Sequence, residues 1–163
     1  ALCENDMMED GRFKMNPPLR SSADRDALIA GLNDGTIDAI ATDHAPHSPD
    51  EKSKGLEHSA MGISGLETAF PVLYTYLVMS GKVSLQRILE ALTSSPRKAF
   101  GLPPVLEEGA AADIAIIDTR TEFTIDSSRF LSLGHSTPFE GKRVHGKVLM
   151  TLKDGVAVWK DNN

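Results

Sequence analysis

The chain has 163 residues, of which 40% are hydrophobic, so it is long enough to bury the core of one domain or of two small ones. Its net charge is −6 and no basic cluster exceeds two residues, which excludes an electrostatic surface for nucleic acid or anionic membranes. The single cysteine, Cys3, excludes an internal disulfide and favours a cytoplasmic location. No apolar stretch reaches the roughly 18 residues of a membrane span. We therefore expect neither a membrane nor a nucleic-acid partner.

The first segments predict a loop, a helix and a strand. Two prolines make Lys14 to Arg20 a rigid loop, because proline excludes a regular helix there. Ser21 or Ser22 can cap a helix that ends at Gly35. We expect a strand from Thr36 to Ala41 to follow. The helix should bury one face formed by Ala23, Ala27, Leu28 and Leu32.

A cluster of polar residues follows directly after this apolar segment and is the most informative feature of the chain. Asp43, His44 and His47 come where the predicted strand ends. An α/β barrel presents its catalytic groups at this end of its strands, so we expect Asp43 at the mouth of such a barrel. There it could ligate a metal or transfer a proton. The alternative is a turn-forming aspartate beside surface histidines.

The middle of the chain predicts a surface loop and two helices. Ser48 to Ser59 is polar and is expected to be a mobile loop. A helix is predicted from Ile63 to Met79, in which Pro71 either bends the helix or lies in its first turn. Ser84 can cap the next helix, which Thr93 to Pro96 should end before a short turn. Expected inward positions of the two helices are Leu66, Phe70, Leu73, Leu77, Val78, Leu85, Ile88, Leu89 and Leu92.

From Gly101 onward the pattern changes to the alternation typical of strands. Strands are predicted over 113–118, 122–125, 144–152 and 156–159, with a hairpin turn at Asp154-Gly155. We therefore divide the chain into a barrel part, residues 1–101, and a β module, residues 102–163. An eight-stranded barrel takes about 250 residues. The chain is accordingly expected to be the C-terminal part of a longer protein.

Other polar residues are candidates for ligand binding. Asn16 offers an amide donor and acceptor on a stiff loop, and Gly62 to Gly65 offers backbone groups before a helix. Arg20 could bind a substrate carboxylate, although capping the following helix region or binding a surface acid is favoured. The remaining histidines, His58, His135 and His145, lack the spacing of metal ligands. The chain alone is thus not expected to form a strong zinc site.

Four motifs together resemble bacterial class I dihydroorotases of the amidohydrolase superfamily. They are Asn16 to Arg20, Asp38 to His47, Gly62 to Thr68, and the segment from Ser136 to Val148. The resemblance implies the C-terminal part of a metal-dependent (β/α)8 TIM barrel plus a small flanking β-sandwich domain. It also implies two zinc ions and the reversible conversion of (S)-dihydroorotate to N-carbamoyl-L-aspartate in pyrimidine biosynthesis.

The resemblance also implies roles for individual residues. Asp43 is the catalytic carboxylate and a zinc ligand, and it passes a proton to the departing ring nitrogen. Asn16, His47, Met61 and Gly62 match substrate-binding positions, the last two through their backbone. His44 is expected to support the site without touching the ligand. The His-x-His pair, the bridging acidic residue and two further histidines of the family are absent from this chain, so the isolated chain is expected to be inactive.

The partners of the protein and two alternative functions remain to be considered. The resemblance implies a homodimer and a possible association with aspartate transcarbamoylase. A dihydroorotase-like subunit that only scaffolds that enzyme would share the fold without the activity. Allantoinases and hydantoinases share the barrel and the chemistry, but their loops usually lack this pairing of motifs.

Overall fold

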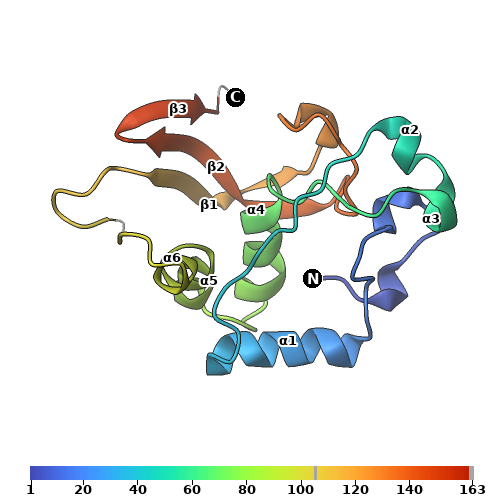
Figure 1. Ribbon diagram of the computed structural model, residues 1–163, viewed down its shortest axis with the longest axis horizontal. Helices are drawn as coiled ribbons and strands as arrows, with labels where there is room; N and C mark the ends of the chain where they lie inside the picture. Colours follow the sequence, from blue (N-terminus) through green and yellow to red (C-terminus); the bar gives the residue numbers. More distant parts are fainter. Residues whose placement is uncertain (105, 162–163) are drawn as a thin grey trace.

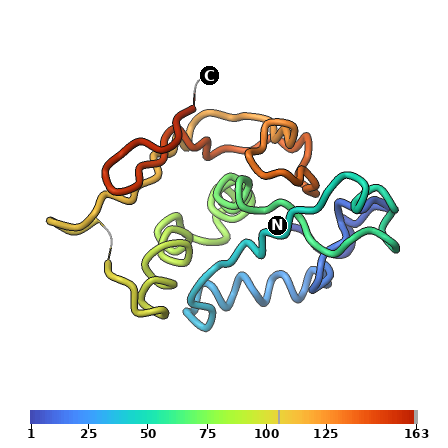
Figure 2. The backbone as a smooth tube through the Cα atoms, turned by 45° about the horizontal axis from the view of Figure 1, so that its top comes forward, coloured from blue at the N-terminus to red at the C-terminus, as the bar shows by residue number. Residues whose placement is uncertain are grey.

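The computed structural model describes residues 1–104 and 106–161, so parts of the predicted module 102–163 lie outside the described residues at Val105, Asn162 and Asn163. The β-sheet lies on one side, α1 lies on the opposite side, and α4 lies between them (Figures 1 and 2). No helix in the described part is both long enough and apolar enough to cross a membrane. The helices are α1 (Ser22–Asp34), α2 (Pro49–Lys52), α3 (Gly55–His58), α4 (Ala69–Leu73), α5 (Leu85–Leu92) and α6 (Ser94–Ala99).

Helix α1 has the predicted ends but not the predicted buried face. The Ser21 hydroxyl accepts the amide N–H of Asp24, whose carboxylate in turn accepts the N–H of Ser21, and Gly35 ends the helix with φ 83°. Leu32 is buried as predicted, whereas Leu28 is 60% exposed. Ala23 and Ala27 are exposed as well. The prediction for these three residues is wrong, because the helix packs mainly through its C-terminal end, where Gly31 lies against Ile37.

The strand predicted over 36–41 is not formed among the described residues. Hydrogen bonds to α5 take the place of strand pairing: Ile40 donates its N–H to the Ala91 carbonyl at 3.0 Å, and the Arg87 side chain donates to the carbonyl of Ile37. A strand needs a neighbouring strand for its ladder of hydrogen bonds. The pairing that the structure shows nearby is an isolated parallel bridge between His44 and Ile63. The prediction of a strand is therefore wrong for this structure.

The prediction of a loop over 48–59 is also wrong, since this segment contains α2 and α3. Ser48 caps α2 by accepting the N–H of Glu51, and Pro49 occupies the first helical position, where no N–H is required. The Lys52 side chain points inward and leaves the residue only 7% exposed. Short local helices and one buried side chain thus give this polar segment a defined conformation.

The helix predicted from Ile63 begins later, at Ala69. Ser64 donates its N–H to the Ser136 carbonyl at 2.8 Å, which holds the preceding residues outside the helix and leaves Leu66 60% exposed. Pro71 is the third residue of α4, so the first-turn alternative is confirmed. The helix continues as a π-helical turn, Tyr74–Val78.

Helix α5 agrees with the prediction at both ends, since it ends at Leu92, directly before Thr93. Ser84 accepts the N–H of Arg87 at 3.1 Å, and Ile88 is fully buried. Leu89, expected inward, is 41% exposed. Instead of the predicted turn, α6 follows directly, because Pro96 lies in its first turn, where proline is compatible with a helix.

The C-terminal part forms one antiparallel sheet in the order β1-β2-β3. Its strands are β1 (Ile114–Thr124), β2 (Arg143–Lys153) and β3 (Val156–Lys160). The two strands predicted over 113–118 and 122–125 are one strand, β1, with an irregular register between Asp118 and Glu122. The turn at Asp154-Gly155 is confirmed, with φ 51° and 78°.

Two apolar clusters hold these layers together. Val72 of α4 packs with Ile125 and Val144 and so fixes the sheet on the helix. Leu77, Val83 and Ile88 form the second cluster, which also contacts Ile40 and thus the segment that leads to Asp43. The candidate site is attached to the core through this second cluster.

Candidate active site

The segment with the predicted catalytic residues runs beside the glycine-containing segment 61–65. Besides the bridge of His44 to Ile63, Ala45 donates its N–H to the Ile63 carbonyl at 3.0 Å. Asp43 is exposed and has φ 46°, a conformation that aspartate tolerates better than most residues. Among the described residues its carboxylate has no hydrogen-bond or ion-pair partner. It is therefore available to a ligand.

His47, Met61 and Gly62 lie together, as predicted. His47 Nε2 is 3.0 Å from the Met61 carbonyl oxygen, and its Nδ1 is 3.7 Å from a carboxylate oxygen of Glu51. Gly62 has φ 145°, and a Cβ there would lie 2.6 Å from the Ala45 carbonyl oxygen. Only glycine fits this close approach. Hydrogen bonds from Ser48 keep the pKa of Glu51 below its usual value, so the carboxylate beside His47 stays ionised.

Lys52 connects the loop of Asn16 to the loop of Met61. Its Nζ donates to the carbonyls of Lys14, Ala60 and Gly62 at 3.0, 2.7 and 2.7 Å. Gly62 donates its own N–H to the Lys14 carbonyl at 3.0 Å. The segments around residues 14 and 61, far apart in the sequence, are thereby fixed side by side.

Asn16 and Arg20 lie at the two ends of one exposed loop. Asn16 follows the segment that Lys52 holds and is itself exposed. Arg20 Nε is 3.9 Å from a carboxylate oxygen of Asp24 in the first turn of α1. Of the two favoured alternatives for Arg20, the structure shows the binding of a surface acid.

His44 belongs to a hydrogen-bonded chain that holds the segment behind Asp43. Its Nδ1 accepts the N–H groups of Gly65 and Leu66, both at 3.2 Å, and its Nε2 is 3.2 Å from Ser132 Oγ. Ser132 Oγ donates to Glu67 at 2.8 Å. Because Nδ1 accepts, Nε2 carries the ring proton and donates to Ser132. Both ring nitrogens are thus engaged within the chain, which agrees with a supporting role.

Sequence reasoning missed Lys52, Glu67 and Ser132. The Lys52 ammonium binds only backbone carbonyls. Every residue type has a backbone carbonyl, so the sequence does not reveal these partners. Glu67 and Ser132 lie 65 positions apart.

The described residues do not form a metal site by themselves. No group of three or more His, Cys, Asp or Glu side chains in that part of the chain could hold a metal ion. His58 is exposed beside Glu57, and His135 packs edge-on against Phe130. His145 is 3.7 Å from a carboxylate oxygen of Glu122. Asp43 could supply one ligand, but a zinc site requires at least three from the protein.

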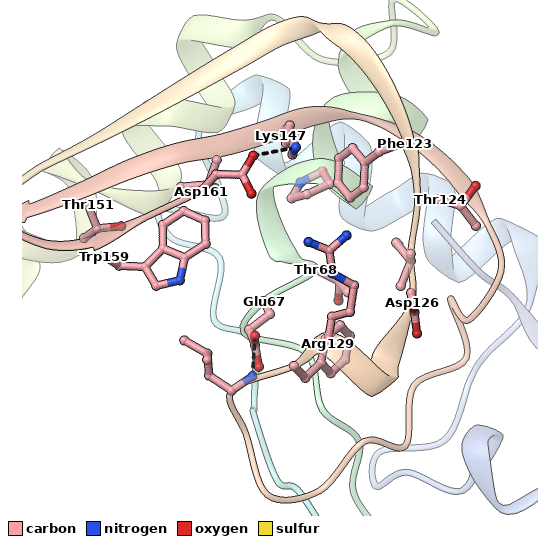
Figure 3. A pocket seen from close by; sticks show the side chains of 15 residues that line it. Glu67, Thr68, Phe123, Thr124, Asp126, Arg129, Lys147, Thr151, Trp159 and Asp161 are labelled. Atoms are coloured by element: carbon pink, nitrogen blue, oxygen red, sulfur yellow. Dashed lines mark hydrogen bonds and ion pairs between the residues drawn. The ribbon is translucent and has the colours of Figure 1, made fainter. Parts of the chain in front are cut away.

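Two cavities lie elsewhere in the described part of the chain, and neither is lined by Asn16, Asp43, His47, Met61 or Gly62. One, of about 410 Å³, lies between α4 and the sheet, with Phe123, Arg129 and Trp159 around it (Figure 3). The other, of about 500 Å³, lies beside α1 and includes Leu28 and Arg20. The structure therefore brings the predicted binding loops together, but the described residues do not enclose Asp43 in a cavity.

Known proteins resemble the chain in sequence. It is 52% identical to the dihydroorotase of Bacillus cytotoxicus over 162 residues, and 53% identical to the dihydroorotase of Brevibacillus brevis over 163 residues. Each match covers 98% of this chain and 38% of the other protein. The chain thus spans well under half the length of these curated relatives.

A solved structure resembles the fold. The L-hydantoinase (dihydropyrimidinase) of Arthrobacter aurescens superposes with a TM-score of 0.88 at 31% identity, covering 99% of this chain and 38% of that one. The model of the amidohydrolase family matches residues 9–158, which include every predicted site residue. The chain belongs to the amidohydrolase family.

Proposed function

We propose that the chain is the C-terminal part of a dihydroorotase, which interconverts (S)-dihydroorotate and N-carbamoyl-L-aspartate in pyrimidine biosynthesis. The observation that carries this proposal is the 52–53% identity to dihydroorotases over 98% of the chain. The arrangement of the loops supports it, because Lys52 joins the segment before Asn16 to the segment before Met61, and the Met61 carbonyl contacts His47, four residues after Asp43.

The proposal extends to the architecture of the whole enzyme. Residues 1–101 would contribute to a (β/α)8 barrel, in which the segment 36–41 gains the strand neighbours it lacks here. Residues 102–163 would form part of a β-sandwich, with the sheet β1-β2-β3 as one of its layers. We further propose a cytoplasmic homodimer, with aspartate transcarbamoylase as a possible partner.

Asp43 would move the proton in this reaction. Hydrolysis of the cyclic amide requires that a water oxygen attacks the ring carbonyl, that the C–N bond breaks, and that the departing nitrogen gains a proton. A carboxylate on the rim can accept the water's proton and deliver it to that nitrogen. Asp43 suits this role because no described residue neutralises or covers its carboxylate.

The other predicted residues would bind the substrate, whose ring and carboxylate are rich in carbonyl and N–H groups. The Asn16 amide can both donate and accept hydrogen bonds. His47 is oriented through Nε2 by the Met61 carbonyl, so its Nδ1 side faces outward toward Glu51. The backbone groups of Gly62 are used within the chain, which leaves the N–H of Met61 as the donor for a ligand.

Zinc belongs to the proposal, but this chain does not hold it alone. The donor set among the described residues falls short of a zinc site, so the two ions expected in the family would need ligands from outside this chain, with Asp43 adding one. No step above depends on the metal.

The test is Asp43→Asn in the full-length enzyme, assayed in both directions with dihydroorotate and N-carbamoyl-L-aspartate. Because a general acid–base group contributes about 10²–10⁴-fold, we expect kcat to fall by at least that factor. Asp50→Asn, an exposed aspartate in α2, serves as the control. Parent-like turnover of Asp43→Asn would remove this residue from the mechanism.

A second candidate activity is hydantoin or dihydropyrimidine hydrolysis. It is favoured by the close superposition on the Arthrobacter aurescens L-hydantoinase, although the identity to that protein is 31% against 52–53% for the dihydroorotases. Parallel assays with dihydroorotate, hydantoin and dihydrouracil separate the two. Preferential turnover of either uncharged ring would reject dihydroorotase in favour of this second activity.

A further inference from the structure

The buried ammonium group of Lys52 is an unusual feature of the candidate site. The residue is only 7% exposed, and its three hydrogen bonds go to carbonyl oxygens of the backbone. It forms no ion pair with any carboxylate in the described part of the chain. Buried charges are usually paired, so an ammonium compensated by peptide dipoles alone needs an explanation.

The position of Lys52 is fixed from several sides. Ser48 and Glu51 cap the short helix that carries it. Gly11 packs so closely on the lysine backbone that a Cβ there would lie 2.1 Å from the Lys52 carbonyl oxygen. The Ser59 hydroxyl accepts the N–H of Lys54 at 3.2 Å and closes the following turn. The ammonium therefore occupies a defined point between the loops.

The three carbonyls connect the Lys52 ammonium to the loops that carry the predicted substrate-binding residues. In a trans peptide unit the C=O and the N–H point in opposite directions. The carbonyl of Ala60 belongs to the same peptide unit as the N–H of Met61. Because Lys52 binds this carbonyl, the Met61 N–H points away from the ammonium group. No acceptor for the Met61 N–H occurs among the described residues. The ammonium also polarises this peptide unit, which makes its N–H a stronger donor.

We propose that Lys52 is a positioning residue of the substrate site: it orients the loops of Asn16 and Met61 so that the Met61 N–H faces an oxygen of the anionic substrate. This inference rests on the proposed dihydroorotase function. The positive charge of Lys52, which no described carboxylate pairs, favours an anion nearby, and dihydroorotate carries a carboxylate. Met61 makes the contact, and Lys52 acts through it.

The electrostatic surroundings agree with this role. Burial lowers the pKa of Lys52, while the charge of Asp10 opposes that shift and Lys14 adds to it. An anion bound near the loops would favour the charged form in the same way as Asp10. The bound substrate and the ammonium would therefore stabilise each other.

The test compares Lys52→Met with Lys54→Met in the full-length enzyme. Lys54 lies two residues later, is exposed, and serves as the matched control. Lys52→Met removes the three charge-assisted hydrogen bonds of the ammonium. We therefore expect the KM for dihydroorotate to rise by about 10–100-fold, and kcat per bound zinc to change less. A merely structural lysine would reduce the active fraction and the zinc content but leave KM unchanged. Lys52→Arg, which keeps the charge and several donors, should recover part of the lost affinity.

A second measurement does not depend on turnover. Hydrogen exchange at the Gly62 amide, which donates to the Lys14 carbonyl, should become at least tenfold faster in Lys52→Met. Where the Met variant does not fold, Lys52→Gln takes its place in both measurements. A parent-like KM in a folded variant without the ammonium, or unchanged exchange at Gly62, overturns the proposal. Absence of dihydroorotate turnover in the parent enzyme would reject the proposed function, and the exchange experiment would then decide the role of Lys52 in ordering the loops.

Discussion

Substitution of His44 by alanine tests the hydrogen-bonded chain behind Asp43, the proposed catalytic carboxylate. Nδ1 of this histidine accepts two backbone N–H groups, from Gly65 and Leu66, and Nε2 donates to Ser132. An alanine side chain can replace none of these three hydrogen bonds. We expect the segment 63–67 to separate from the segment that carries Asp43.

The size of the effect follows from the three hydrogen bonds that alanine removes. A hydrogen bond contributes about 0.5–1.5 kcal/mol, and water can replace part of it here because Leu66 is largely exposed. We therefore expect local opening to become easier by about 1–3 kcal/mol, which corresponds to about 5–150-fold faster amide exchange. Ser132→Ala removes the hydrogen bond at Nε2 and that of Ser132 Oγ to Glu67 but keeps both hydrogen bonds of Nδ1, so it should have a smaller effect on the amides of Gly65 and Leu66. His44→Asn keeps an acceptor near the position of Nδ1 and should retain most of the protection.

Amide exchange at Gly65 and Leu66, followed by NMR or mass spectrometry, measures this opening directly. Both amides should exchange faster in His44→Ala, and kcat of the full-length enzyme should fall because Asp43 loses its support. Exchange within about twofold of the parent at both amides would show that His44 does not hold this segment. The increase in exchange should be largest for His44→Ala, smaller for Ser132→Ala and smallest for His44→Asn.

Three further predictions concern the same structure. Gly62→Ala should abolish most activity, because its Cβ would meet the Ala45 carbonyl oxygen at 2.6 Å, and a parent-like kcat/KM would refute this. Ile88→Ala should cost about 2–5 kcal/mol in urea unfolding, since the side chain is fully buried. Hydrogen bonding to Lys153 lowers the pKa of Asp113, so its stabilising effect should disappear as the pH falls below about 4, and Asp113→Asn should flatten that part of the pH–stability curve.

Features that depend on a few neighbouring residues could be predicted from the sequence. The serine caps at Ser21 and Ser84 act on N–H groups three residues away, and the turn at Asp154-Gly155 needs only two residues with positive φ. The neighbouring sequence contains every partner that these features require. Their positions agree with the structure for that reason.

Features that depend on a distant neighbour were predicted less well. The segment 36–41 has the apolar pattern of a strand, but its pairing depends on another segment, and here Arg87 and Ala91 of α5 satisfy its backbone. The late start of α4 has the same cause, because the bond from Ser64 to Ser136 joins residues 72 positions apart. Periodicity reports which side of a segment is apolar, not which partner lies beside it.

The residues of the candidate site also fall into those that could be predicted from their sequence neighbours and those that could not. Asp43 and His47 could be found because they stand close together in the sequence, where a polar cluster follows an apolar segment. Lys52 and Glu67 could not, since one binds carbonyl oxygens and the other binds Ser132 and the backbone of the same distant loop. A residue that supports others through the backbone has no characteristic spacing.

The loops of the candidate site are therefore held by a different kind of interaction from the core. Apolar packing around Ile88 fixes the segment that leads to Asp43, whereas Lys52 and His44 fix the loops beyond it through hydrogen bonds. Polar contacts are directional, so loss of one shifts a loop without unfolding the domain. Core substitutions should consequently lower stability and activity together. Substitutions at Lys52 and His44 should change KM or kcat while most of the stability remains, and this separation distinguishes a binding rim from a merely structural one.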